Sequence, residues 1–278
     1  MTADLRAKAL HWQAVGKPAV VVEVLSSKGS VPREVGTRML VASDDVAGTI
    51  GGGHLELQAI SDARTLIRQG GNGSRRQHIA LGPTLGQCCG GVLDLGFTPL
   101  ADMDLHHSAA WPSVPVLFKL QLYGAGHVGR AVARLLATLP CQVSWIDERE
   151  EQFPRDLALP PHIDKLCVEP VAAEVAAAPP GCCYLVLTHS HDLDLALASA
   201  ILQRDDVAWF GLIGSQTKRA RFEARLRQRG VDEARLQRMV CPIGLPGIRG
   251  KEPEVIAVAV VAQLLQFASA TAAGDPPP

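Results

Sequence analysis

Residues 122–136 read LYGAGHVGRAVARLL, and this stretch decides the fold of the second half of the chain. It carries the pattern Gly-x-Gly-x-x-Gly at Gly124, Gly126 and Gly129, directly after an apolar segment and at the start of a helical one. In dinucleotide-binding folds the first glycine permits a tight turn, the second lets a pyrophosphate approach the backbone, and the third allows close packing of helix on strand. The N–H groups at such a helix N-terminus favour phosphate. The stretch therefore predicts a Rossmann-like turn that can hold a phosphate.

An acidic residue follows where such folds place one. Asp147 ends the next apolar segment, QVSWID (142–147), and a carboxylate there can bond a ribose hydroxyl. Arg149, two residues later, would also suit a ribose 2′-phosphate. We therefore expect NAD or another nucleotide at the turn, with Asp147 among the ligand-binding residues. The alternative is that the glycines only shape the turn and hold no nucleotide, because a fold does not guarantee a function.

The segments downstream of this turn alternate between strand and helix patterns. Apolar runs such as CCYLVLTH (182–189) and VAWFGLIG (207–214) are separated by helical stretches such as LDLALASAILQR (193–204). Strands separated by helices of that length indicate a doubly wound parallel sheet. We predict an α/β chain whose Rossmann-like domain covers residues 116–270 and closes with a helix over 253–270, followed by a disordered tail over 271–278.

Residues 1–100 predict a smaller α/β domain. AVVVEVLSS (19–27) is β-branched and typical of a buried strand, and the strand patterns on either side of Asp44 and Asp45 predict a hairpin. GGGHLELQAISDARTLIRQG (51–70) has helical periodicity between glycines. The polar, proline-containing segment over 101–115 is expected to be a linker between the two domains.

Composition excludes several classes of function. The sequence has 27 Lys and Arg against 28 Asp and Glu, so nothing global attracts the protein to nucleic acid or to an anionic membrane. The N-terminus lacks the apolar core of a signal peptide, and no apolar run is expected to reach membrane-spanning length. Seven cysteines, an odd number, favour reduced thiols over a disulfide framework. We expect a cytoplasmic protein.

Two adjacent cysteines stand in a glycine-rich loop, LGQCCGG (85–91). Thiolates suit soft metals better than carboxylates do, and glycines let a backbone approach a bulky ligand. Neighbouring cysteines fit neither zinc-ligand spacing nor an ordinary disulfide, so we expect one of Cys88 and Cys89 to be a ligand and the other to support it. The alternative is that both are small buried hydrophobic residues.

A histidine pair follows a predicted central strand. THSHDLD (188–194) places His189, His191 and Asp192 just past the strand, where ligands bind in such sheets. These residues could ligate a metal or serve in acid–base chemistry, although no further ligands follow at a recognisable spacing. The alternative is that they cap the following helix and line a cleft.

Basic residues are concentrated near the C-terminus. KRARFEARLRQR (218–229) contains Glu223 as its single acidic residue. Such a run is usually a solvated helix face, and the alternative is a patch that meets an anionic cofactor or an acidic partner. In the glycine- and proline-containing loop that opens the segment 243–257, Arg249 or Lys251 could reach a phosphate.

Several of these segments, taken together and in order, resemble one protein family. They are SSKGSVPREVGTRMLV (26–41), GTIGGGHLE (48–56), LGQCCGG (85–91), GAGHVGRA (124–131) and GLPGIRGKEPEVIA (244–257). They are similar to the xanthine dehydrogenase accessory proteins of the XdhC/CoxI family, and the similarity spans about residues 5–268. The cysteine loop joined to a downstream Rossmann turn is a specific combination, whereas the Rossmann pattern alone would not be.

The resemblance implies a chaperone for the molybdenum cofactor, molybdopterin, rather than an enzyme. It implies that the protein shelters the cofactor and delivers it to the molybdenum subunit of apo-xanthine dehydrogenase or a related molybdenum hydroxylase. It further implies contact with a cysteine desulfurase and with a molybdenum insertion protein.

Carried over by position, the resemblance assigns a cofactor-binding role to the cysteine loop, with Cys88 and Cys89 as candidate metal ligands. The loop residues are Gln87, Cys88, Cys89, Gly90 and Gly91. A glycine-rich helix start matches the family at Gly51, Gly52, Gly53 and Glu56, and the Rossmann turn matches at Gly124, Gly126 and Gly129. The family leaves the ligand of the Rossmann turn open.

Two other functions fit parts of the sequence. An NAD-dependent oxidoreductase would use His189 or His191 as its acid–base residue but would leave the cysteine loop without a role. A thiol-dependent sulfurtransferase would carry a persulfide on Cys88 or Cys89 toward the cofactor. For either function, and for the chaperone, we expect a homodimer because most soluble oligomers are symmetric dimers.

Overall fold

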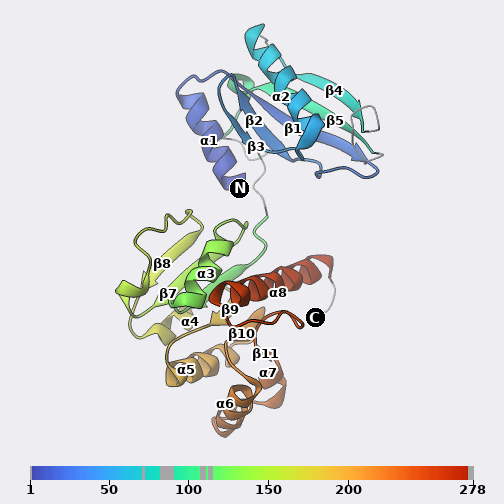
Figure 1. The fold of residues 1–278 in the computed structure, drawn as a ribbon. Helices are drawn as coiled ribbons and strands as arrows, with labels where there is room; N and C mark the ends of the chain where they lie inside the picture. Colours follow the sequence, from blue (N-terminus) through green and yellow to red (C-terminus); the bar gives the residue numbers. More distant parts are fainter. Residues whose placement is uncertain (1, 71–72, 82–90, 107–110, 112–114, 275–278) are drawn as a thin grey trace. The chain divides into compact units, whose positions relative to one another are not determined.

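The computed structural model describes residues 2–70, 73–81, 91–106, 111 and 115–274. The chain forms two compact units, residues 1–114 and residues 115–278. Figure 1 shows an antiparallel sheet with its helices in the first unit and a parallel sheet flanked by helices in the second. The prediction of a small α/β unit followed by a Rossmann-like doubly wound unit is confirmed.

The first unit is built on a five-stranded antiparallel sheet of order β3-β2-β1-β5-β4. The strands are β1 (Ala19–Lys28), β2 (Arg38–Ala42), β3 (Val46–Gly48), β4 (Arg75–Ala80) and β5 (Val92–Pro99). The predicted hairpin at Asp44 and Asp45 is confirmed, since β2 and β3 pair on either side of it. The predicted strand over 19–27 is also confirmed and is the central strand of the sheet.

Helices cover both faces of this sheet, which explains why β1 is apolar at consecutive positions. Val20, Val22 and Val24 share a core with α2 (Gly53–Arg68), whereas Val21 shares a core with α1 (Thr2–Ala14). Side chains alternate between the faces of a strand, so a run of valines supplies both cores at once. The helix that the glycine-bounded segment predicts is therefore held by one face of β1.

The segment predicted as a linker belongs in large part to the first unit. Leu100, Leu105 and Trp111 are buried in the core beneath α1, and residues Leu100–Asp102 form a 3-10 helix, η2. The side-chain amide of Gln13 on α1 donates hydrogen bonds to the carbonyls of Leu100 and Met103. Two large apolar side chains inside a polar stretch therefore extend the first core beyond residue 100.

The second unit contains a six-stranded parallel sheet of order β11-β10-β9-β6-β7-β8. The strands are β6 (Lys119–Tyr123), β7 (Gln142–Asp147), β8 (Ile163–Cys167), β9 (Cys183–Val186), β10 (Trp209–Leu212) and β11 (Met239–Val240). The chain moves outward from β6 to β8 and then returns to β9 on the other side of β6. Ligands of such sheets bind outside the carboxyl ends of the strands where the order reverses, here between β6 and β9.

Two apolar cores lie on the two faces of this sheet. One core includes residues of α3 (His127–Leu136) and α8 (Pro253–Ala273). The other includes residues of the four helices α4 (Glu174–Ala177), α5 (His191–Leu202), α6 (Gln216–Gln228) and α7 (Glu233–Gln237). Figure 1 shows α3 and α8 beside each other, away from α5 and α6.

The closing helix differs from the prediction in two respects. It continues to Ala273, so the first part of the predicted tail is helical, and residues 275–278 lie outside the described part of the chain. By length and composition alone this helix of 21 residues could cross a membrane, so the expectation that no apolar run reaches that length is wrong. In the structure, Ala257, Val260 and Leu264 pack in a core of the second unit.

Two of the three glycines of the turn are required by packing. Gly124 has φ +115°, and a Cβ there would lie 2.5 Å from the carbonyl oxygen of Leu187. A Cβ on Gly129 would lie 2.0 Å from the carbonyl oxygen of Gly124. At Gly126 a Cβ would meet no atom within 4 Å, and its φ of −69° suits any residue. Gly126 therefore has no packing reason within the described chain to be glycine.

This contrast predicts opposite outcomes for two similar substitutions. Gly129→Ala should lower the free energy of unfolding by about 2–3 kcal/mol, because its methyl group overlaps a backbone oxygen that cannot move freely. Gly126→Ala is the matched control and should cost no more than about 1 kcal/mol, the effect of replacing a glycine N-cap. Urea denaturation followed by circular dichroism measures both, and equal losses would contradict this account of the turn.

Candidate functional site

Side chains of neighbouring elements hold the Rossmann turn through hydrogen bonds to its backbone. The N–H of Ala125 donates to Asp147 Oδ2 at 2.7 Å, and Trp145 Nε1 donates to the carbonyl of Gly124 at 3.0 Å. Arg130 Nε donates to the carbonyl of Ala125 at 3.0 Å. Residues of α3 and β7 thus fix both ends of the peptide that a ligand would approach. Because these bonds are made within the chain, the turn is formed before any ligand arrives.

The structure gives Asp147 a different immediate partner from the expected ribose. Its side chain is buried, and Oδ1 accepts hydrogen bonds from Arg149 Nε and from the Arg149 backbone N–H, each at 3.0 Å. Arg149 Nη2 also donates to Oδ2 at 3.1 Å. A ribose hydroxyl would have to share this carboxylate with the guanidinium. The ribose role of Asp147 stays a prediction, while its role in ordering the turn is visible.

These contacts set the charge state of Asp147. Burial favours the neutral acid, but the hydrogen bonds from Arg149 and from the N–H of Ala125 outweigh burial and lower the pKa of the Asp147 carboxyl. The same ion pair raises the pKa of the Arg149 guanidinium, although burial opposes this. The pair is therefore fully ionised at neutral pH and joins the end of β7 to the glycine turn.

The lowered pKa predicts how stability responds to acid. A carboxyl whose pKa falls on folding stabilises the fold above its unfolded pKa of about 3.9, and this contribution is lost as the pH falls through the folded pKa. Asp147→Asn should therefore be less stable than the parent at pH 7 and should lose less stability between about pH 5 and pH 2. Asp164→Asn, on the exposed part of β8, is the control and should retain the parent's acid dependence. Free energies of unfolding measured for the parent and both variants across this pH range test this prediction.

Gly126 is the position at which a ligand has access to the backbone. It is the N-cap of α3, the helix whose first N–H groups lack intrahelical acceptors. The absence of any described atom within 4 Å of a Cβ there leaves room for a phosphate against these N–H groups. The arrangement can therefore bind a phosphate or pyrophosphate group.

Filling this space should block the ligand without harming the fold. Gly126→Val places a branched side chain where the phosphate would lie, so affinity for NAD or ADP should fall at least tenfold, or about 1.4 kcal/mol. Titration calorimetry measures the affinity, and circular dichroism checks that the variant is folded. Unchanged affinity in a folded Gly126→Val protein would show that the turn does not hold the phosphate.

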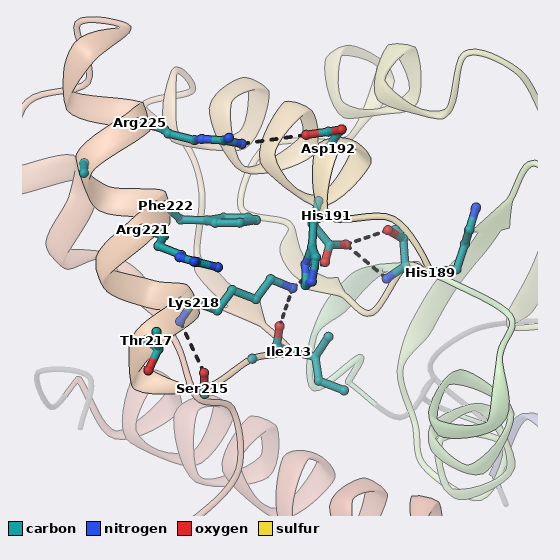
Figure 2. A pocket seen from close by; sticks show the side chains of 14 residues that line it. His189, His191, Asp192, Ile213, Ser215, Thr217, Lys218, Arg221, Phe222 and Arg225 are labelled. Carbon is teal, nitrogen blue, oxygen red and sulfur yellow. Dashed lines mark hydrogen bonds and ion pairs between the residues drawn. The ribbon is translucent and has the colours of Figure 1, made fainter.

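The histidine pair and part of the basic helix line one cavity, between the N-termini of α5 and α6 (Figure 2). The cavity has a volume of about 900 Å³ and opens beyond the carboxyl ends of β9 and β10. The residues that line it are Thr188, His189, His191, Asp192, Asp194, Ile213, Gly214, Ser215, Thr217, Lys218, Arg221, Phe222, Ala224 and Arg225. The fold thus brings the histidine pair and part of the basic run together in one cavity.

The histidines line the cavity but do not cap the helix. The cap of α5 is Ser190, whose hydroxyl accepts a hydrogen bond from the N–H of Leu193 at 3.3 Å. His189 Nε2 lies 3.7 Å from Glu148 Oε1, beyond the end of β7. Within the described residues, no group of three or more His, Cys, Asp or Glu side chains could hold a metal ion. The described part of the chain therefore gives the metal alternative for this pair no support.

The basic helix divides into two faces. Lys218, Arg221 and Arg225 line the cavity, and their spacing of three and then four residues places them on one face of α6. Elsewhere on the helix, Arg219 pairs with Glu223 at 2.7 Å and Arg227 with Glu233 at 2.8 Å. Part of the basic run is thus paired on the helix surface and part lines a cavity, and contact with an anionic cofactor or an acidic partner stays a prediction. Arg249 and Lys251 are exposed and do not line this cavity.

The wall of the cavity contains a buried ion pair that the sequence patterns do not predict. Lys218 Nζ lies 2.5 Å from Asp194 Oδ2, and the Asp194 side chain is only 1% exposed. The hydroxyl of Thr188 donates to the other oxygen of Asp194 at 2.6 Å. A sequence signal exists in the segment Gly214–Lys218, where a glycine and a serine follow a strand and a lysine follows the serine by three residues. Asp194, the partner of Lys218, lies 24 residues away in the sequence, which is too far for the pairing to be inferred from spacing.

The cysteine loop lies only partly within the described residues. Gln87, Cys88, Cys89 and Gly90 are outside them, so their predicted roles stay predictions. The loop joins β4 to β5, and its described ends are closed by a hydrogen bond from the Leu81 N–H to the Gly91 carbonyl at 2.8 Å.

Gly91 has a packing role that does not depend on a ligand. A Cβ on Gly91 would lie 2.4 Å from the carbonyl oxygen of Ser30, which follows β1. Two residues later along the same connection, Pro32 would lie 2.5 Å from a Cβ on Gly51. The connection after β1 therefore contacts both the end of the cysteine loop and the glycine-rich start of α2.

A carboxylate orders that glycine-rich start. Glu56 Oε2 accepts hydrogen bonds from the Thr49 hydroxyl at 2.5 Å and from the N–H groups of Ile50 and Gly52 at 3.0 and 3.1 Å. The side chain on the first turn of α2 thus takes the place of an anion at the turn before the helix. Glu56 and the glycines form a structural motif that contacts the same connection after β1 as Gly91 does.

Most cysteines among the described residues are buried, as thiols with a purely structural role are. Cys141, Cys182, Cys183 and Cys241 are buried, and Cys167 is exposed. Burial raises the pKa of Cys141 and of Cys183 to about 12, which keeps them as unreactive thiols. The adjacent pair Cys182 and Cys183 packs at the start of β9 as small hydrophobic residues do.

Comparison with known families and proteins gives consistent matches. A family model described as the XdhC Rossmann domain matches residues 120–264, and one described as the XdhC and CoxI family matches residues 12–79. The first range contains the glycine turn and the whole cavity. Neither range includes the cysteine loop.

Two individual proteins match most of the chain. The uncharacterized protein YqeB of Escherichia coli K12 is 29% identical over 258 residues, which are 90% of this chain and 43% of that protein. The chain therefore spans less than half the length of that relative. The crystal structure of a Bacillus halodurans protein described as a xanthine dehydrogenase has a TM-score of 0.73 at 18% identity, covering 95% of this chain and 96% of that one. This second match shows that the two chains share a fold.

Proposed function

This chain belongs to the XdhC and CoxI family, and we infer that it is an accessory protein in the maturation of a xanthine dehydrogenase or a related molybdenum hydroxylase. We propose that its cargo is the molybdenum cofactor, molybdopterin, and that the cysteine loop receives it. The Rossmann turn would hold a phosphate, either of a nucleotide such as NAD or of the cofactor. The observation that carries the proposal is the open space at Gly126, because no described atom lies within 4 Å of a Cβ there and a phosphate would have room against the backbone.

The chemistry of the loop suits such cargo. Molybdenum with sulfur ligands is a soft centre, which thiolates bind better than carboxylates do. The stem of the loop at Leu81 and Gly91 is held by a backbone hydrogen bond and by contact with the chain after β1. The described stem lies against the connection after β1, which also contacts Gly51 before α2. Cys88 and Cys89 are the residues that we propose as the metal ligand and its support.

The proposal includes the partners that handle the cofactor before and after this protein. Delivery requires contact with the molybdenum subunit of apo-xanthine dehydrogenase. Receipt requires contact with the proteins that complete the cofactor, a cysteine desulfurase and a molybdenum insertion protein. These roles concern the protein in the cytoplasm, and a homodimer remains our expectation for its assembly.

One feature of the turn makes a nicotinamide-dependent enzyme a weaker explanation. In such an enzyme Asp147 would bind the ribose, but three hydrogen bonds from Arg149 already occupy this carboxylate. A ligand whose phosphate alone contacts the turn does not need the ribose bond. The ion pair of Asp147 and Arg149 is therefore compatible with a phosphate-bearing cargo at least as well as with a redox nucleotide.

Serine substitutions in the loop test the cargo directly. Cys88→Ser and Cys89→Ser should leave the melting temperature nearly unchanged, yet at least one should abolish cofactor binding, because serine is a poor ligand for a soft metal. Binding is measured as molybdenum content and as pterin fluorescence after oxidation, in protein purified from a molybdenum-replete host. The same variant should fail to activate apo-xanthine dehydrogenase, and activation by the parent should be stoichiometric.

Cys167→Ser is the matched control, since Cys167 is the exposed thiol among the described cysteines. It should retain full cofactor binding. If both loop variants bind cofactor as well as the parent does, the loop is not the molybdenum site. If mass spectrometry instead finds a persulfide on Cys88 or Cys89 that is consumed during activation, the protein is a sulfurtransferase rather than a chaperone.

A further inference from the structure

The cavity between α5 and α6 carries an excess of positive charge. Its lining contains the cations Lys218, Arg221 and Arg225 against the anions Asp192 and Asp194, and two histidines add protonatable nitrogens. Asp194 is neutralised by Lys218, and Arg225 lies 3.7 Å from Asp192. Arg221 remains as the lining cation without an ion-pair or hydrogen-bond partner among the described residues. The excess charge is thus located on one guanidinium that faces the cavity.

Lys218 is held in place for a further contact. Its ammonium group lies 2.5 Å from Asp194 Oδ2 and donates to the carbonyl of Ile213 at 2.8 Å. An ammonium group has three donors, so these two bonds leave one, and the ring of Phe222, which also lines the cavity, has its centroid 5.2 Å from Nζ. A Cβ on Gly214 would lie 2.6 Å from Lys218 Cδ, so the glycine gives the lysine stem the room it occupies. Asp194 and Gly214 are therefore positioning residues for this charge.

The surrounding groups can meet several oxygens of one ligand. In Figure 2, Arg221 and Lys218 extend from α6 toward the side of the cavity where His191 lies, with Thr217 at the start of α6. Helices α5 and α6, of 12 and 13 residues, both begin at the cavity, and their first N–H groups lack intrahelical acceptors. An arginine fork, an ammonium donor and a hydroxyl together match a phosphoryl group, which offers several anionic oxygens.

The cavity adjoins the Rossmann turn but is a separate space. Gly124 of the turn contacts the backbone at Leu187 and Thr188, and Thr188 also lines the cavity. The residues that would hold a phosphate at the turn are Gly126 and the start of α3, and neither lines the cavity. A volume of about 900 Å³ is suited to a small molecule or to part of one.

We propose that this cavity is a second phosphoryl-binding site, which takes the phosphate or pyrophosphate group of a small-molecule ligand. Arg221 and Lys218 contact the phosphoryl oxygens, and Asp194 and Gly214 position Lys218. The site does not depend on whether the cargo of the protein is the molybdenum cofactor. It can therefore be tested with a simple anion on the full chain.

Inorganic pyrophosphate is the probe, titrated calorimetrically at constant ionic strength. Arg221→Gln should weaken binding at the cavity at least tenfold and leave any binding at the turn unchanged, while the protein stays folded because Arg221 is exposed and makes no described bond. Arg229→Gln, at the C-cap of α6 and outside the cavity, removes the same charge and should change affinity less than twofold. Gly126→Val, which fills the turn, should still bind pyrophosphate, and Arg221→Gln in that background should remove the remaining binding.

Four results would overturn the proposal. One is that pyrophosphate does not bind the parent protein, and another is that Arg221→Gln and Arg229→Gln weaken binding equally, as a general loss of charge would do. The third is that malonate competes as well as pyrophosphate, since the site would then select carboxylates. Loss of binding in Gly126→Val alone would place the phosphoryl group at the turn and would also overturn the cavity site.

Discussion

The second unit depends on how closely the backbone approaches itself at Gly124. The N–H of this residue donates to the carbonyl of Ile146 at 2.8 Å, and its carbonyl accepts from Trp145 Nε1 at 3.0 Å. On one side Gly129 of α3 lies against its carbonyl, and on the other side the carbonyl of Leu187 lies against its Cα. One peptide thus joins the end of β6, the start of α3, strand β7 and the connection from β9 to α5. The turn and the cavity wall are consequently parts of one packed assembly.

This constraint separates two kinds of glycine that the sequence pattern treats alike. Gly124 and Gly129 are needed because any side chain would collide with backbone, and a Rossmann-type fold without a ligand would need them equally. Gly126 has open space instead, so packing within the described chain does not require a glycine there. The glycine pattern therefore reflects packing of the fold at two positions and leaves room for a ligand at the third.

The fold could be predicted from the sequence because the periodicities are local. Alternation of apolar strands and helical stretches indicated the doubly wound sheet, and the β-branched run over 19–27 indicated a strand buried on both faces. The linker prediction was less accurate, because the burial of Leu105 and Trp111 depends on α1, which is distant in sequence. The extra turn of the closing helix beyond residue 270 likewise carries no strong stop signal before Gly274, where φ becomes positive.

The site was predicted less completely, because its contacts join distant residues. Asp147 was correctly placed beside the glycine turn, but its pairing with Arg149 is a matter of side-chain geometry that spacing does not give. The basic run over 218–229 predicts mainly a solvated helix face, although Lys218, Arg221 and Arg225 line a cavity. The pairing of Lys218 with Asp194 joins two helices and two strand ends, so only the folded chain reveals it.

That ion pair also shows why the net charge of the chain says little about its ligands. Removing two charges from water costs free energy that their attraction only partly offsets, so a buried pair is weak evidence for stability. Here the pair fixes the position of an ammonium group at a cavity wall, while Arg221 beside it has no described carboxylate partner. Exposed charges separated by more than about 8 Å are largely screened at physiological salt, so a ligand responds to these few groups. A chain with a net charge of −1 can therefore present a cavity lined by more cations than anions, because only Asp192 and Asp194 of its 28 acidic residues line it.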